Sequence, residues 1–199
     1  MQKKGMVWVI GASGGLGRAA AQAFAQNGWS VIAGARSFAE GTSPLGEGVT
    51  ALPLDVTNDE SCTVFTEKAL GMENRVDVLV CAAAQLVLGS CENTTVDELD
   101  KLLNVNVLGT VRMIQRALPL MRKQKSGKII LFSSINGLLG IPFQSAYTAS
   151  KHALEGYAEC LAMETAAFGI QVCLVEPGDH RGGSSHTRLH AKNEKNTVY

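Results

Sequence analysis

The sequence lacks an excess of charge of either sign, because its 199 residues include 18 basic and 18 acidic residues. Binding to nucleic acid or to an anionic membrane surface needs a clustered positive field, so the charge balance argues against both partners. Long apolar runs are missing too. The run Met6–Ile10 is too short for the core of a signal peptide and ends at a glycine. No run could span a bilayer, so we expect no membrane-spanning segment.

Paired cysteines are also missing. The five cysteines are an odd number with no C-x-x-C pair, so the sequence predicts neither a disulfide framework nor a zinc site. This usage is typical of a reducing compartment, and we expect a cytoplasmic protein. His186 and His190 are four residues apart, with His180 upstream, but no glutamate has the metalloprotease position and no third ligand has a fixed spacing. We therefore predict no metal site.

Short apolar runs alternate with longer stretches of helical periodicity. Six runs are typical of strands, at residues 6–10, 30–35, 49–55, 76–84, 127–134 and 170–178. Four stretches are typical of helices, at residues 15–27, 58–71, 95–123 and 145–168. Repeated strand and helix predict a parallel sheet, and strands that are apolar throughout indicate helices on both faces. The prediction is a single α/β domain with a Rossmann-type, doubly wound parallel sheet in three α/β/α layers.

Capping signals agree with these helix boundaries. Thr57 with Glu60, and Thr95 with Glu98, have the spacing of a capping box. Three glycines stand where helices are expected to end, namely Gly28, Gly71 and Gly169. A doubly wound sheet binds ligands beyond the carboxyl ends of its strands, so we expect the chemistry of the protein there.

A glycine-rich turn in "VIGASGGLGRAA" joins the first strand to the first helix. Gly11, Gly15 and Gly17 let the backbone turn tightly and approach a phosphate, which free N–H groups and the helix dipole would bind. The first strand-to-helix turn is the context that dinucleotide binding requires, so Ser13 and Leu16 of the same turn join the predicted cofactor site. A P-loop is excluded because no Gly-Lys-Ser/Thr follows. A purely structural turn is the alternative.

Arg36 bears on the choice of dinucleotide. NAD usually meets an acidic residue at the end of the second strand, whereas an arginine there accommodates the 2′-phosphate of NADP. In "SVIAGARS" the strand end carries Arg36 and no acid, and a guanidinium can bind a phosphate through two hydrogen bonds. We predict NADP, with NAD as the alternative cofactor. The competing interpretation is that Arg36 is a solvated surface charge.

A lysine interrupts the apolar stripe of the last predicted helix. Tyr147, Lys151 and Leu154 are spaced by four and three residues and share one helix face. Burial of an unpaired ammonium group costs several kcal/mol or shifts its pKa, so Lys151 either reaches solvent or meets a specific partner, such as Tyr147 or a ligand. Nearby, Ser133 or Ser134 ends the fifth strand at the rim of the expected crevice.

Together these motifs resemble the short-chain dehydrogenase/reductase family. The resemblance covers roughly residues 4–178, and the middle of the chain looks closest to the hydroxysteroid and retinol dehydrogenases. Ser134 precedes Tyr147 by 13 positions (147 minus 134), and Lys151 follows it by four. The matching residues, in chain order, are Gly11, Gly15, Gly17, Asp55, Asn106, Ser134, Tyr147, Lys151, Pro177 and Gly178.

The resemblance implies an oxidoreductase that interconverts a ketone or aldehyde and an alcohol by hydride transfer. Tyr147 would exchange a proton with the substrate oxygen, Ser134 would donate a hydrogen bond to it, and Lys151 would lower the pKa of Tyr147 and bind the nicotinamide ribose. Asn106 would hold a water linked to Lys151. The cofactor would also meet Asp55, Val56, Ala82, Ala83, Ala84, Pro177 and Gly178. An apolar substrate is expected, because the segment "INGLLGIPF" would line the mouth of its pocket.

Two stretches depart from the family pattern. Cys81, Ala82, Ala83 and Ala84 stand where the family usually has Asn-Asn-Ala-Gly, so a bracing asparagine is absent and weaker rigidity or cofactor affinity is expected. The chain is short at its C-terminus. We therefore expect a dinucleotide-binding catalytic domain over 1–181, and a polar loop or tail over 182–199 that begins a missing substrate lid.

The family resemblance also suggests an assembly, and two rival functions remain open. The long helices around Asn106 and Tyr157 resemble surfaces through which the family forms dimers or tetramers, so we expect a homodimer or homotetramer. The first rival is a catalytically silent dinucleotide-binding protein, for example a redox-sensing partner. The second is a structural or interaction domain that keeps only the fold.

Overall fold

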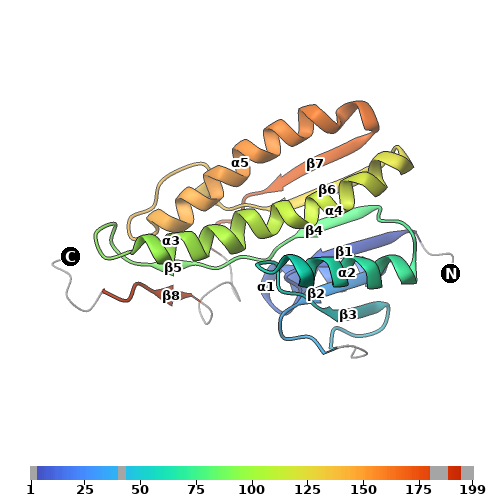
Figure 1. Cartoon of the computed structure of the whole chain (residues 1–199), viewed down its shortest axis with the longest axis horizontal. Coiled ribbons are helices and arrows are strands. Elements are labelled where there is room, and N and C mark those ends of the chain that lie inside the picture. The colour runs from blue at the N-terminus through green and yellow to red at the C-terminus, as the bar shows by residue number, and fades with distance from the viewer. Residues whose placement is uncertain (1–3, 40–43, 180–187, 194–199) are drawn as a thin grey trace.

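A computed structural model describes residues 4–39, 44–179 and 188–193 of the chain (Figure 1). Its main sheet has six strands in the order β3-β2-β1-β4-β6-β7, and every neighbouring pair is parallel. The predicted doubly wound parallel sheet is thereby confirmed. The six strands are β1 (Met6–Ile10), β2 (Ser30–Ala35), β3 (Val49–Pro53), β4 (Val78–Cys81), β6 (Gly127–Phe132) and β7 (Ile170–Val175).

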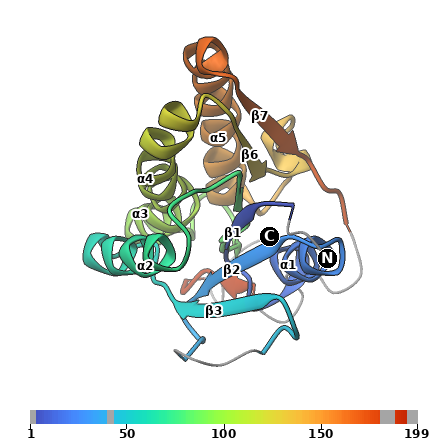
Figure 2. The same ribbon diagram turned by 90° about the vertical axis from the view of Figure 1, so that its right-hand side faces the viewer.

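Helices cover both faces of this sheet, as the apolar strands require. Trp8 and Ile10 of β1 point into a core shared with α2 (Asp59–Met72), α4 (Gly109–Gln124) and α5 (Ser145–Thr165). Val7 and Val9 alternate with them and pack in a second core with α1 (Gly15–Gln26). Figure 2 shows α1 and α2 on opposite sides of the strands. The two cores make the sheet the rigid frame from which the loops project.

The segment predicted as one helix over 95–123 is divided into three parts. The capping box of Thr95 and Glu98 is confirmed and begins α3 (Val96–Leu103). A π-helical turn, η1 (Asn104–Leu108), follows and leads into α4, so that the Gly109 N–H donates to the carbonyl of Asn104, five residues back. Turns of this kind are frequent at functional sites.

Two other predicted helix boundaries differ from the structure. Asn58, not Thr57, is the N-cap of α2, because its side chain accepts a hydrogen bond from the Ser61 N–H at 2.9 Å. Gly71 lies inside the last turn of α2 rather than beyond it. Gly28 and Gly169 follow helical turns with φ values of 82° and 68°, as predicted for glycines that end helices.

A second, two-stranded sheet joins distant parts of the chain. β5 (Val87–Leu88) pairs in parallel with β8 (Leu189–His190), and Ala191 next to β8 is buried beside Leu102 and Ala146. Figure 1 shows the two short strands side by side, near the beginnings of α3 and α5. β8 falls within the segment 182–199, where the sequence predicts a polar loop or tail. His180 and His186 lie outside the described residues, and His190 is exposed in β8.

All five cysteines of the chain are free thiols. Within the described ranges, no helix combines the length and the apolar character needed to cross a membrane.

Phe65 tests how far the fold depends on the larger core. Its side chain is fully buried on α2 and meets the Trp8 ring edge to face, with ring centroids 5.9 Å apart. We expect Phe65→Ala to lower the free energy of unfolding by about 3–5 kcal/mol, because a buried ring is lost and a cavity remains. Urea unfolding measures the loss. Phe168→Ala, at a ring that is 41% exposed, is the control, and an equal loss in both variants would contradict this account.

Candidate active site

The glycine turn after β1 is shaped by close contacts of the backbone. Gly11 has a φ of 87°, and a Cβ on it would lie 2.4 Å from the backbone nitrogen of Ala83. A Cβ on Gly17 would lie 2.3 Å from the carbonyl oxygen of Gly11. No side chain fits at either position. The turn therefore brings the loop after β1 against the segment after β4, at the carboxyl edge of the sheet.

The N-terminus of α1 has the features of a phosphate site. Its N-cap, Gly14, is extended and no side chain caps it, and no acidic residue lies in the first turn. Ser13, Gly14 and Gly15 are exposed, whereas Leu16 is half-buried. The first N–H groups of a helix carry partial positive charge and need acceptors, so this end fits the pyrophosphate of a dinucleotide.

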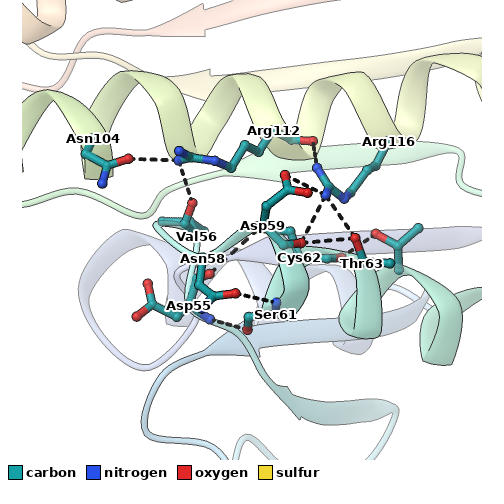
Figure 3. Close-up of polar contacts among 11 residues, drawn as sticks. Asp55, Val56, Asn58, Asp59, Ser61, Cys62, Thr63, Asn104, Arg112 and Arg116 are labelled. Carbon is teal, nitrogen blue, oxygen red and sulfur yellow. Dashed lines mark hydrogen bonds and ion pairs between the residues drawn. The ribbon is translucent and has the colours of Figure 1, made fainter.

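The residues predicted to meet the adenosine end lie at the ends of β2 and β3. Arg36 is exposed directly after β2, and Val56 is buried. Burial alone would raise the pKa of Asp55, but hydrogen bonds from Thr57 and the charges of Arg36 and Arg112 lower it below its ordinary value. Asp55 is therefore a carboxylate at neutral pH. Figure 3 shows Val56 beside Arg112 of α4.

Asn106 in η1 has a different set of partners from the predicted water. Its buried amide accepts from the Gln85 N–H at 2.7 Å and donates to the Gln85 carbonyl at 2.9 Å and to Ser150 Oγ at 3.0 Å. It thus fixes the backbone that follows Ala82, Ala83 and Ala84. Both amide hydrogens are used within the protein, so a water between Asn106 and Lys151 would need another atom of Asn106.

Lys151 is buried and has a specific partner. The side chain is 2% exposed, and its Nζ donates to the main-chain carbonyl of Phe132, at the end of β6, at 2.7 Å. The same Nζ lies 5.4 Å from the centre of the Tyr147 ring. Burial lowers the pKa of Lys151 to about 8, against the upward influence of the Glu155 carboxylate. Of the alternatives drawn from the sequence, Lys151 meets a partner and does not reach solvent.

Ser134 and Tyr147 come together at this edge. Burial raises the pKa of Tyr147 above its ordinary value, while its hydrogen bond with Ser134 acts in the opposite direction. The predicted lowering by Lys151 is absent in the polypeptide alone, and it stays a prediction for the cofactor-bound protein. Ser133 is buried as well, but its hydroxyl has no partner among the described residues.

Two polar residues that the sequence analysis missed, Ser150 and Asn136, hold this arrangement in place. Ser150 Oγ donates to the Tyr147 carbonyl at 2.7 Å and accepts from Asn106, so it links α5 to η1. Asn136 donates to Thr148 Oγ1 at 3.0 Å and to Gln144, and its N–H donates to Ser134 Oγ. The signal was available, because buried hydroxyl and amide groups beside a reactive pair need partners.

The remaining predicted residues are placed by the loop after β7. The carbonyl of Pro177 accepts from the Ile135 N–H at 3.1 Å, which brings the Pro177-Gly178 segment beside the Ser134 loop. A hollow of about 560 Å³ lies nearby and is lined in part by Ile141, Pro142 and His152. It contains none of the four predicted catalytic residues. Leu138, Leu139 and Phe143 are exposed, as expected of residues at the mouth of an apolar pocket.

Comparisons with known proteins support the family resemblance drawn from the sequence. The profile of the family described as short chain dehydrogenase matches residues 5–193. The 3-ketodihydrosphingosine reductase of Bacteroides thetaiotaomicron is 40% identical over 183 residues, which are 92% of this chain and 66% of that protein. Estradiol 17-beta-dehydrogenase 1 of Rattus norvegicus is 43% identical over 143 residues, 72% of this chain and 40% of that protein. The chain thus spans no more than about two thirds of either relative.

A solved structure titled "ElxO with NADP Bound" superposes with a TM-score of 0.81 at 32% sequence identity. The match covers 89% of this chain and 74% of that one.

The buried ammonium group predicts a pH dependence of stability. The folded protein holds the Lys151 proton less tightly than the unfolded chain does, because burial lowers the pKa from 10.5 to about 8. Between these values the unfolded state binds more protons at this group, so its contribution to stability rises with pH. Relative to Lys151→Met, the unfolding free energy of the wild type should rise by about 3 kcal/mol as pH increases through this window.

Urea unfolding of both proteins below pH 8 and above pH 10.5 measures the change. Lys128→Met, at an exposed position of β6, is the control for the loss of a lysine. Equal behaviour of the two variants would contradict the burial of a titrating Lys151.

Proposed function

Because the chain belongs to the short-chain dehydrogenase family, we propose that it acts as an NADP(H)-dependent oxidoreductase that interconverts a ketone or aldehyde and an alcohol. One observation carries the proposal: the buried ammonium group of Lys151 lies 5.4 Å from the centre of the Tyr147 ring, and Ser134 is close enough to the Tyr147 hydroxyl to influence its pKa. A proton donor, a second hydrogen-bond donor and a cation thus meet at the carboxyl edge of the sheet, where this fold binds ligands.

Each of these three side chains has a separate task. NADPH, when bound, supplies the hydride that the carbonyl carbon of the substrate accepts. Tyr147 donates a proton to the carbonyl oxygen, and Ser134 donates a hydrogen bond to the same oxygen as negative charge develops. Lys151, with the positive charge of the oxidised ring, favours the phenolate form of Tyr147, which offsets the rise in its pKa caused by burial. In the reverse direction Tyr147 accepts the proton of an alcohol.

The predicted cofactor residues are suited to the parts of the dinucleotide. The open N-terminus of α1 and the glycines of the turn would hold the pyrophosphate, and Arg36 would meet the 2′-phosphate. Asp55 and Val56, with the segment 82–84, would contact the adenosine half, while Pro177 and Gly178 would lie at the nicotinamide half. The NADP bound by the ElxO structure is consistent with this choice of cofactor.

The proposed substrate is apolar. Exposed Leu138, Leu139 and Phe143 adjoin the Ser134 loop, and apolar side chains typically line such pockets. The two relatives are named for a keto compound and for a steroid alcohol, which fits a carbonyl or hydroxyl group on a largely hydrocarbon body. We further propose a cytoplasmic homodimer or homotetramer, with residues 1–181 as the catalytic domain and 182–199 as the start of a substrate lid.

Tyr147→Phe is the direct test of the chemistry. The phenyl ring keeps the packing but has no proton to exchange, so turnover of a ketone panel should fall by about 10²–10⁴-fold while NADPH binding stays near the wild-type level. NADPH oxidation and fluorescence titration measure the two properties. If the wild type binds NADPH but shows no turnover, and the variant behaves identically, the chain is a silent dinucleotide-binding protein. An absence of binding would favour a purely structural domain.

Arg36→Asp tests the choice of cofactor. A carboxylate repels the 2′-phosphate and can accept from a ribose hydroxyl, so the Kd for NADPH should rise at least about tenfold while the Kd for NADH falls or is unchanged. Arg122→Asp, on an exposed turn of α4, makes the same change of charge elsewhere and is the control. Equal weakening of NADPH and NADH binding by Arg36→Asp would refute a contact with the 2′-phosphate.

A further inference from the structure

Arg112 of α4 joins two segments that belong to different parts of the proposed cofactor site. Its Nη1 donates to the main-chain carbonyl of Val56 at 3.0 Å and to Oδ1 of Asn104 at 2.9 Å (Figure 3). Val56 follows β3 at the adenosine end, whereas Asn104 begins η1. The side chain is partly buried, so both hydrogen bonds are shielded from water. Charge-assisted bonds of this kind are the stronger ones in proteins.

A second, independent contact brings the same two segments together. Gly109, the first residue of α4, packs so closely on Val56 that a Cβ on it would lie 2.6 Å from Val56 Cγ2. Gly109 lies three residues before Arg112, so both face the same side of the helix. The first turn of α4 therefore contacts both the side chain and the main-chain carbonyl of Val56.

The hydrogen bonds that begin at Val56 and Arg112 continue to the segment after β4. Asn104 and Asn106 belong to the same π-helical turn, and Asn106 binds the N–H and the carbonyl of Gln85. Gln85 directly follows the segment 81–84, which stands where the family resemblance implies Asn-Asn-Ala-Gly. A chain of hydrogen bonds thus runs from Val56 through Arg112 and η1 to the backbone beside Ala84.

We propose that Arg112 is a positioning residue for the adenosine half of the dinucleotide, holding the backbone at Asp55 and Val56 in fixed register with η1 and the segment 82–85. This role rests on the proposed function. In this proposal Arg112, a residue of α4, supplies the stabilising contacts that the missing asparagine would otherwise have made. Arg112 touches neither the hydride nor the proton that moves, so it affects cofactor affinity rather than the chemical step.

Arg116, one turn further along α4, offers a matched comparison. Its Nη2 donates to Asp59 Oδ1 at 2.8 Å and to Thr63 Oγ1 at 3.1 Å, so it clamps α4 to α2. Within the described part of the chain, its guanidinium forms no hydrogen bond with Val56 or Asn104 (Figure 3). Both arginines thus stabilise the packing of α4, but of the two only Arg112 contacts Val56, which belongs to the proposed cofactor site.

The test compares Arg112→Met with Arg116→Met in the full chain. Both changes keep an apolar stem and remove one positive charge and the guanidinium hydrogen bonds. For Arg112→Met we expect the Kd and KM for NADPH to rise about tenfold, which corresponds to about 1.4 kcal/mol, with kcat within about twofold of the wild type. For Arg116→Met we expect a comparable loss of thermal stability and an unchanged Kd. Fluorescence titration and steady-state kinetics measure these quantities.

Gly109→Ala provides a second route to the same displacement if Arg112→Met folds poorly. The new methyl group collides with Val56 and leaves the charge of the site unchanged, so the Kd for NADPH should again rise while kcat is retained. An unchanged Kd in both Arg112→Met and Gly109→Ala would overturn the proposal. So would equal losses of affinity in Arg112→Met and Arg116→Met.

The proposed function can fail separately. If the wild type binds no dinucleotide, the function is wrong whatever the variants do. If it binds NADPH and neither Arg112→Met nor Gly109→Ala changes the Kd, only the role of Arg112 is wrong.

Discussion

The amide of Asn106 is the interaction on which the site depends. A buried amide that lost its partners would cost about 1–3 kcal/mol for each unsatisfied group, so the segments that satisfy it are held firmly in place. Those segments are the backbone at Gln85 and the hydroxyl of Ser150. Since Ser150 in turn holds the Tyr147 carbonyl, one side chain ties the loop after β4 to the start of α5.

The electrostatics of the site follow from burial. Lys151 and Tyr147 both lie where water is scarce, and this opposes the charged form of each. The carbonyl of Phe132 compensates Lys151 in part, because it accepts a hydrogen bond at the end of β6. Both shifts favour the neutral forms, but a lysine whose pKa is about 8 still carries its charge at neutral pH, whereas the tyrosine is neutral. An oxidised nicotinamide ring would change this balance, and the protein alone does not.

Much of the fold could be predicted because its signals are local. Apolar runs and helical periodicity predicted the six strands of the sheet, and the turn at Gly11 indicated the edge at which a ligand is proposed to bind. The stripe that contains Lys151 faces inward as its periodicity predicted, but periodicity left open whether the ammonium group reaches solvent or meets a partner. Ser134 and Tyr147 came from the family resemblance, and the structure brings them together.

The features that escaped prediction depend on tertiary contacts. Pairing of β5 with β8 needs two short segments about a hundred residues apart, and neither has a strand pattern of its own. The choice of Asn58 over Thr57 as N-cap depends on backbone geometry that spacing does not encode. Arg112 has no signal in the sequence, because one of its acceptors, the carbonyl of Val56, lies on a distant part of the chain.

The π-helical turn has a consequence for how this chain can vary. Each residue of an α-helix turns the following residues by about 100°, so the one extra residue within η1 resets the phase of α4 relative to α3. Deletion of a single residue there would leave a smooth, continuous helix, yet it would swing Gly109 and Arg112 off Val56 and turn the apolar stripe of α4 off the sheet. A regular α-helix through residues 104–108 would turn α4 to the wrong side. The π-helical turn sets the rotation of α4 that this fold requires.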